Sequence, residues 1–351
     1  MYTFESLIKL AAERHASDLH LSPGRVPSCR IDGVITGILP EKLTAQDTQE
    51  IADQILNETR RLTLEQDGEV DFACFDPAIG RFRLNIFRQR NSIALVARIL
   101  NAEIPEPRML GIPDSVVEVS HKKSGLILVT GPTGVGKTTT IASLLNQINL
   151  NYEKHIITLE DPIEYLHPHA RSIVNQREVG ADTRTFATGL FSALREDPDI
   201  IFIGEMRDLD TISSAITAAE TGHLVLSTLH TPGSSSTIDR IIDVFPPHQQ
   251  QQIRTQLADV LECVVSQRLL PCANAEGRVA AMEVMLTNSA IRNCIRENKS
   301  YQIPSVIQTH RAEGMQTMDT AIVNLYYSGK ITRETAYSYA SDKEQLKHIL
   351  N

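Results

Sequence analysis

Hydrophobic residues recur with two different spacings over the first hundred positions of the chain. In residues 4–14 and 44–64 they recur three and four positions apart, which predicts amphipathic helices. Elsewhere they are grouped or alternate with polar residues in short runs that predict strands, at 18–22, 28–35, 69–75 and 81–87. Turn residues stand at Asp32-Gly33 and at 76–80. We therefore expect residues 1–100 to form a small α+β domain.

The pattern changes after residue 100. Residues 101–113 contain three prolines and two acidic residues with little periodicity, which favours an interdomain linker. Beyond them, apolar runs alternate with helical spacings, and these runs lie at 126–130, 155–159, 200–203 and 224–228. Such alternation predicts a mostly parallel sheet flanked by helices, so the fold class is α/β. A second domain is expected over 114–351, with a helical C-terminal part over 288–351.

Composition and charge narrow the class of protein. The 351 residues are 42% hydrophobic and 22% charged, which is typical of a globular protein with room for two domains. The net charge of −9 argues against a general nucleic-acid surface. No apolar run reaches the roughly 18 residues of a membrane span, and residues 1–6 lack signal-peptide features, so we expect a cytoplasmic protein. The five scattered cysteines form no CxxC pair and are expected to be reduced.

The clearest chemical motif is a phosphate loop. Residues 131–138 read Gly-Pro-Thr-Gly-Val-Gly-Lys-Thr, between the strand-like 126–129 and the helix-compatible 139–148. Such a loop surrounds a phosphate with backbone N–H groups at the positive end of a helix dipole. Lys137 is expected to contact the β and γ phosphates, and the Thr138 hydroxyl to bind Mg²⁺. The sequence predicts a nucleotide and Mg²⁺ as ligands, with nucleotide-binding residues Gly131, Pro132, Thr133, Gly134, Val135, Gly136, Lys137, Thr138 and Thr139.

Acidic residues follow two of the other apolar runs, at the sheet edge where open α/β proteins bind ligands. Residues 160–164 contain three carboxylates, and residues 204–208 contain Glu205. Glu205 is the first candidate to polarise the attacking water, and Glu164 is the second. Either segment alone could instead be a solvated acidic loop.

Gly204 stands where most phosphate-loop enzymes carry an aspartate before the glutamate. Metal contact is therefore expected from Thr138 and, through water, from the acids of 160–164, with Glu160 as the candidate.

Two histidines flank the apolar run 224–228. His230 follows it and is expected to sense the γ-phosphate or position water, the alternative being a structural histidine. His223 precedes the run and is a second candidate for phosphate sensing. A strand between them would separate the two side chains by roughly 20 Å, so they cannot share one metal ion.

The strand-like run 81–87 carries arginines on one face. Arg81 and Arg83 alternate with apolar residues, and together with Arg88 they are candidate arginine fingers for the γ-phosphate of a neighbouring subunit. A solvated strand face is the alternative. A groove for single-stranded nucleic acid is disfavoured because no aromatic residues interleave with the arginines on that face.

At this point the ordered motifs resemble a known family. The chain resembles the ATPases of type II secretion and type IV pilus machines, and most closely the pilus retraction ATPases. The matching segments are ASDLHLS at 16–22, the phosphate loop, TLEDPIEY at 158–165, NQREVG at 175–180, REDPDIIFIGEMRD at 195–208, AETGH at 219–223, TLHT at 228–231, AIRNCIRE at 290–297 and GMQTMD at 314–319.

This resemblance implies a PAS-like N-terminal domain followed by a RecA-like ATPase domain, assembled as a homohexamer. It implies Glu205 and Glu164 as the catalytic pair, with nucleotide between the two domains and arginines reaching the site. The implied partners are an inner-membrane pilus platform protein and a paralogous retraction ATPase, with no nucleic acid. The implied location is the cytoplasmic side of the inner membrane, at the pilus base.

Further features of the family distinguish motors that retract a pilus from motors that assemble a pilus or secrete a protein. Assembly and secretion members usually carry an extra N-terminal domain and a four-cysteine zinc module. Here the phosphate loop begins at residue 131, and Cys263 and Cys272 have no CxxC partners. These features favour a motor for pilus retraction and twitching motility. An assembly or secretion motor, a RecA-like nucleic-acid translocase and a regulatory ring without turnover remain as alternatives.

Overall fold

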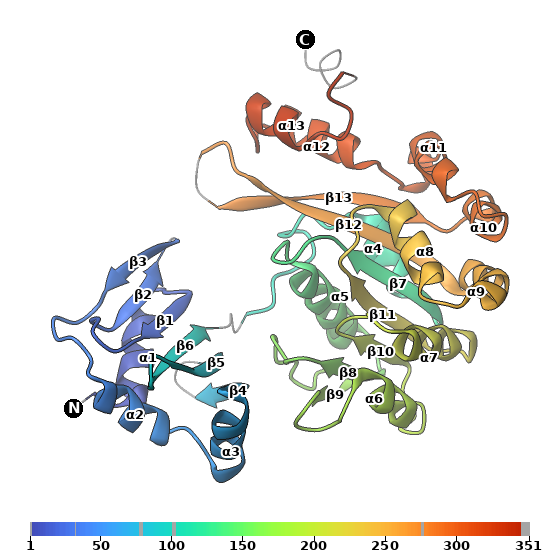
Figure 1. Cartoon of the computed structure of the whole chain (residues 1–351). Helices are drawn as coiled ribbons and strands as arrows, with labels where there is room; N and C mark the ends of the chain where they lie inside the picture. The colour runs from blue at the N-terminus through green and yellow to red at the C-terminus, as the bar shows by residue number, and fades with distance from the viewer. Residues whose placement is uncertain (1, 32, 77–79, 100–102, 275–276, 345–351) are drawn as a thin grey trace. The chain divides into compact units, whose positions relative to one another are not determined.

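The computed structural model describes residues 2–31, 33–76, 80–99, 103–274 and 277–344. The chain divides into two compact units (Figure 1). The first comprises Met1–Glu103 and the short segment Pro162–Leu166, and the second comprises Ile104–Asp161 and His167–Asn351. The predicted turns include residues 32 and 77–79, and the predicted linker begins with 101–102; these positions lie outside the described residues.

The first unit is built on one antiparallel sheet. Its elements are α1 (Phe4–Glu13), β1 (Asp18–Leu21), β2 (Ser28–Ile31), β3 (Val34–Gly37), α2 (Ala45–Asp53), α3 (Glu58–Asp67), β4 (Glu69–Asp76), β5 (Gly80–Gln89) and β6 (Ser92–Ile99). The strand order is β3-β2-β1-β6-β5-β4, with antiparallel neighbours throughout. Alternate strand residues such as Leu19, Leu84 and Ile86 join apolar residues of the helices in one core.

Two features of this unit differ from the sequence prediction. The helical spacing over 44–64 forms two helices, because the Asn57 side chain accepts a hydrogen bond from Arg60 N and begins α3. Strand β6 was not predicted, although it lies at the centre of the sheet between β1 and β5.

The second unit contains the predicted parallel sheet. Its strands are β7 (Gly125–Thr130), β8 (His155–Glu160), β9 (Ile173–Glu178), β10 (Ile200–Ile203), β11 (Leu224–Leu229), β12 (Leu261–Pro271) and β13 (Arg278–Leu286). The order is β13-β12-β7-β11-β10-β8-β9, and β13 alone runs antiparallel to its neighbour within the described residues. The four apolar runs correspond to β7, β8, β10 and β11, whereas β9, β12 and β13 were not predicted.

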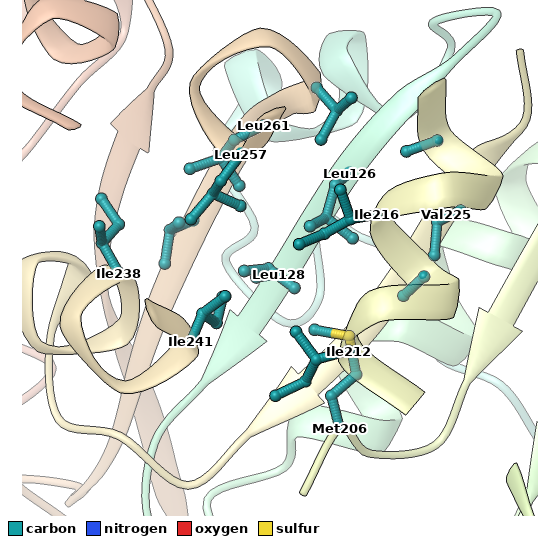
Figure 2. Close-up of a cluster of buried hydrophobic side chains, with 14 of the residues drawn as sticks. Leu126, Leu128, Met206, Ile212, Ile216, Val225, Ile238, Ile241, Leu257 and Leu261 are labelled. Atoms are coloured by element: carbon teal, nitrogen blue, oxygen red, sulfur yellow. The ribbon is translucent and has the colours of Figure 1, made fainter. Parts of the chain in front are cut away.

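Helices cover both faces of this sheet. They are α4 (Asp114–Val119), α5 (Lys137–Asn151), α6 (Phe186–Ala193), α7 (Leu209–Glu220), α8 (Ser234–Asp243), α9 (Pro247–Val260), α10 (Ser289–Arg296), α11 (Ile303–Thr309), α12 (Met318–Tyr327) and α13 (Arg333–Tyr339). Helices α4 and α5 pack on alternate strand residues such as Ile127 and Phe202. Helices α6 to α11 pack on the intervening residues, including Leu126 and Leu128, as Figure 2 shows for part of this core.

The segment predicted as a linker belongs to the second unit from Ile104 onward. Ile112 is buried in the core beneath α5, and the Ser143 hydroxyl donates to the Pro105 carbonyl oxygen at 2.6 Å. The helical C-terminal part is present as α10 to α13 with two 3₁₀ turns, Ser300–Gln302 and Arg311–Glu313. Among the described residues, no helix combines the length and apolar character that a membrane span requires.

Candidate active site

The phosphate loop connects β7 to α5, as the sequence predicts. Gly131, Gly134 and Gly136 have φ values of 139°, 79° and 85°, which residues with a Cβ rarely adopt. A Cβ at Gly131 would also lie 2.4 Å from the Gln267 carbonyl oxygen. Gly136 is the N-cap of α5, so the loop ends at the positive end of a fifteen-residue helix. The local fold is therefore suited to hold an anion.

Strand register brings the predicted catalytic segments to the same edge of the sheet. Thr130 pairs with Leu229, and Ile203 pairs with both Ser227 and Leu159. The residues that follow these strands are the phosphate loop, His230, Glu205 and the acidic segment that begins at Glu160. This is the carboxyl edge, where open parallel sheets bind ligands.

Lys137 is held against the loop. Its ammonium group is almost buried and donates to the carbonyl oxygens of Gly131 and Pro132, at 2.8 and 3.0 Å. The same ammonium lies 3.4 Å from the His230 Nδ1 atom. Its charge is thereby fixed at the loop, where phosphate oxygens would bind.

His230 connects the loop to Glu205. The Nδ1 atom of His230 lies 3.4 Å from the Thr133 hydroxyl, and its Nε2 atom lies 3.3 Å from a Glu205 carboxylate oxygen. Because an ammonium group only donates and a carboxylate only accepts, these contacts fit the neutral tautomer with the proton on Nε2. The same Glu205 oxygen accepts from Arg207 Nε at 2.7 Å. The general-base candidate and the phosphate loop are thus in contact through one imidazole ring.

Glu160 is buried at the end of β8. Its Oε1 atom accepts hydrogen bonds from the Thr158 hydroxyl at 2.7 Å and from Gln176 Nε2 at 3.0 Å. The other end of the Gln176 amide accepts from the backbone N–H of His167 at 2.8 Å. Burial lowers the pKa of the His167 imidazole to about 4. The acidic segment is therefore anchored to β9 on both sides of 162–166.

Gly204 has a steric reason to lack a side chain. Its backbone N–H donates to the Leu159 carbonyl oxygen, and a Cβ would lie 3.3 Å from that oxygen and 3.5 Å from Glu160 Cα. An aspartate would be crowded against β8 at this position. Thr138 at the start of α5 and the buried Glu160 carry hard oxygen donors of the type that magnesium prefers, and their part in binding Mg²⁺ stays a prediction.

His223 lies at the other end of β11 from His230. Its Nδ1 atom is 3.0 Å from the Ala218 carbonyl oxygen, and its backbone precedes Leu224, which pairs with Gly125 at the start of β7. Six strand residues, about 20 Å, separate it from the loop of its own chain. The structure thus brings His230, and not His223, to the phosphate loop.

The remaining predicted residues belong to the first unit. Glu164 lies in the segment Pro162–Leu166 and the three arginines lie on β5. The predicted alternation is present: Phe82 and Leu84 are buried, whereas Arg81 and Arg83 are half-buried and Arg88 is exposed. Arg83 forms a bidentate ion pair with Asp71, with a shortest contact of 2.6 Å. The catalytic roles of these residues stay predictions.

A cavity of about 550 Å³ lies beside the loop in the second unit. It is lined by loop and α5 residues, by β12 and β13, and by the C-terminal helix α12; among them are Gly136, Thr139, Gln267, Met282 and Leu325. Gln267 and Gln176 could not be recognised from the sequence, because their contacts depend on the register of β12 and β9, which were not predicted.

Comparison with known proteins identifies the family. Residues 3–337 match the family model described as type II/IV secretion system protein. The chain belongs to this family. The resemblance inferred from the motifs is thereby confirmed.

Individual members of the type II/IV secretion family resemble the chain along its whole length. The type IV pilus retraction ATPase PilT of Pseudomonas aeruginosa is 45% identical over 338 residues, which cover 96% of this chain and 98% of that protein. A twitching motility protein of Neisseria gonorrhoeae is 43% identical over 91% of this chain and 86% of its own length. A crystal structure of the pilus retraction motor PilT with bound ADP superimposes with a TM-score of 0.93 at 51% identity, covering 99% and 100% of the two chains. The predicted fold class, with a RecA-like domain, is confirmed.

Proposed function

We propose that this protein is a Mg²⁺-dependent ATPase motor that retracts type IV pili. The observation that carries the proposal is the set of contacts from Lys137 through His230 to Glu205 at the carboxyl edge of the sheet. Supporting it, the relative named as a pilus retraction ATPase is matched over 98% of its length. A nucleotide is the ligand for which a phosphate loop of this geometry is built.

ATP binding is assigned to the phosphate loop. The backbone N–H groups of 133–139 and the Lys137 ammonium would bind the phosphates, and the cavity beside the loop would take the base and ribose. Thr138, with Glu160 acting through water, would hold Mg²⁺, which neutralises part of the phosphate charge when bound. Phosphate oxygens would compete with His230 and the loop carbonyl oxygens for the Lys137 ammonium.

Hydrolysis is assigned to Glu205. Its carboxylate polarises a water whose oxygen attacks the γ-phosphorus while the bond to ADP breaks, and the proton released by the water passes to the carboxylate. His230 donates to Glu205 and so fixes the direction in which its carboxylate faces. Glu164 is the second proposed acid–base residue. Arg81, Arg83 and Arg88 are the proposed arginine fingers, which would offset the charge developing on the phosphoryl group.

The mechanical output requires more than one subunit. We assign a homohexamer at the cytoplasmic side of the inner membrane, acting on a pilus platform protein and accompanied by a paralogous retraction ATPase, with no nucleic-acid partner. The γ-phosphate must bind two arrangements of the two units with unequal affinity, since a ligand shifts an equilibrium only by its differential affinity.

Substitution of Glu205 by Gln in the host chromosome tests this function. We expect surface pili to accumulate and to stop retracting, because the protein binds ATP without hydrolysing it. In vitro, Glu205→Gln should keep ADP affinity while kcat falls by about 10²-fold or more, whereas Lys137→Ala should lose nucleotide binding. Loss of pili, or of a secreted substrate, would instead assign the protein to the assembly or secretion branch. Near wild-type turnover of Glu205→Gln would refute the assignment of the base.

A further inference from the structure

Gln267 is a buried amide that contacts the phosphate loop from a neighbouring strand. It lies on β12 next to Ser266, which pairs with Thr130 at the end of β7, and its exposed fraction is 3%. Its Nε2 atom donates to the Val135 carbonyl oxygen at 2.6 Å. Its Oε1 atom accepts from the Thr140 hydroxyl at 2.8 Å. One side chain thereby joins the loop to the first turns of α5.

The contact with Val135 fixes the orientation of a peptide group in the loop. The Val135 carbonyl and the Gly136 N–H belong to one planar trans peptide, so they point in opposite directions. When the carbonyl oxygen faces Gln267, the Gly136 N–H faces away from β12. An N–H group at this position, directly before Lys137, is one of those with which a phosphate loop binds an anion.

The loop itself does not determine this orientation strongly. Rotation of the peptide between Val135 and Gly136 changes the φ of Gly136, which is 85°, and glycine populates both signs of φ with similar ease. The peptide between Val135 and Gly136 could therefore rotate at low cost without an external contact. Gln267 supplies that contact, and its backbone also approaches Gly131 so closely that no Cβ would fit there.

We propose that Gln267 is a positioning residue for nucleotide binding: it holds the phosphate loop with the Gly136 N–H directed at the phosphate. The Thr140 hydroxyl acts through it, by fixing the rotamer of the amide. The inference rests on the nucleotide binding of the proposed function and adds a residue to that site. It differs from a packing role because it predicts weaker binding of ADP by the folded protein, which a loss of stability alone does not produce.

The test measures the Kd of ADP by calorimetry for four variants of the full chain. Gln267→Met keeps the length of the side chain but removes both hydrogen bonds. Gln250→Met is the matched control. Gln250 lies on α9, away from the loop, and its amide also donates to a backbone carbonyl oxygen, that of Phe245. Thr140→Val and the double variant Thr140→Val/Gln267→Met complete a cycle. Thermal unfolding of each variant is recorded alongside.

We expect Gln267→Met to raise the Kd of ADP about tenfold or more and Gln250→Met to leave it unchanged, at similar losses of Tm. Thr140→Val should raise the Kd about threefold in the wild-type background and have no further effect with Gln267→Met, because its contact is then gone.

A Gln267→Met protein that binds ADP within twofold of wild type would overturn the inference, as would independent effects of the two substitutions. Should Gln267→Met not fold, Thr140→Val alone decides: unchanged affinity contradicts the proposal. These results leave the proposed function intact, whereas failure of the wild-type protein to bind ADP would contradict both.

Discussion

His230 is the residue whose two ring nitrogens face two different parts of the site. Nδ1 lies near Lys137 and Thr133, and Nε2 lies near Glu205. One ring therefore contacts both the Lys137 ammonium, where phosphate is expected to bind, and Glu205, the candidate general base. His223, the other candidate, lies at the opposite end of β11, where its Nδ1 atom is close to the Ala218 carbonyl oxygen.

Replacing each histidine by phenylalanine distinguishes the contributions of His230 and His223 to ATP turnover. His230→Phe removes both contacts while keeping a ring, so we expect kcat to fall by about 10-fold to 100-fold, with a smaller change in the Kd of ADP. His223→Phe is the control and should retain turnover within about twofold. The measurement is steady-state phosphate release by both proteins. A comparable loss of kcat in both would contradict the assignment of the loop contact to His230 alone.

His167 gives the stability of the second unit a defined dependence on pH. The pKa of its imidazole falls to about 4 from an ordinary value near 6.5, because burial disfavours the charged form. The unfolded chain therefore binds this proton first as the pH falls. Above pH 6.5 the imidazole does not change the free energy of unfolding. That free energy falls by about 3 kcal/mol as the pH drops from about 6.5 to 4.

The variant His167→Asn should show a flatter dependence of Tm on pH across that window than the wild-type protein. The exposed His248, replaced by Asn, is the control and should preserve the wild-type slope. Scanning calorimetry at pH 7.5, 5.5 and 4.5 provides the comparison. Parallel curves for wild type and His167→Asn would show that the buried imidazole does not carry the effect.

Among the helices, α2 and α3 show how a single polar residue divides a periodic pattern. Apolar spacing continues through 44–64, yet the chain leaves the helix after Asp53 and restarts at Glu58. Asn57 is responsible because its side chain satisfies the Arg60 N–H at the new N-terminus. Asn57→Ala should therefore cost about 1 kcal/mol.

The expected consequence is a lower Tm by several degrees, about 4–8 °C for a unit of roughly 100 residues. Thr59→Ala, two positions further in the same helix, is the control, since its side chain does not cap the helix. Thermal unfolding followed by circular dichroism makes the comparison. Equal Tm values for the two variants would contradict the capping role of Asn57.

The burial of each strand explains whether it could be predicted from the sequence. Strands β7, β8, β10 and β11 are buried on both faces, so each appears in the sequence as a predominantly apolar run. Strand β9 lies at the sheet edge with mostly half-buried or exposed residues, and β12 carries Gln267 and Arg268 among its apolar residues. Their patterns resemble those of loops or helices. The residues placed by these two strands, Gln176 and Gln267, were accordingly missed.

The whole molecule divides the predicted catalytic residues between its two units. The second unit carries the phosphate loop, Glu205 and His230, whereas the first carries Glu164 and the three arginines. The motifs predicted the loop and the place of His230 at the carboxyl edge of the sheet, because the strand ends determine both. They could not predict which arginine serves which nucleotide, since that depends on the assembly of several copies.

Mixing two inactive variants tests whether the arginines act on a neighbouring copy. Glu205→Gln subunits lack the base but carry every arginine, whereas an arginine variant, Arg81→Ala, Arg83→Ala or Arg88→Ala, retains the base. In a closed ring, each site would meet an arginine from one neighbour. A site formed by an arginine variant would regain that arginine whenever its neighbour is a Glu205→Gln subunit.

We expect an arginine variant that has lost turnover to recover it on mixing with Glu205→Gln, because about a quarter of the sites in randomly mixed rings would be complete. ATPase activity is measured after the subunits have been exchanged, against each variant mixed with itself. An arginine that acts within its own subunit would give no recovery at any ratio. Since Arg83 is already held by Asp71, recovery with Arg83→Ala would further require that ion pair to open when nucleotide binds.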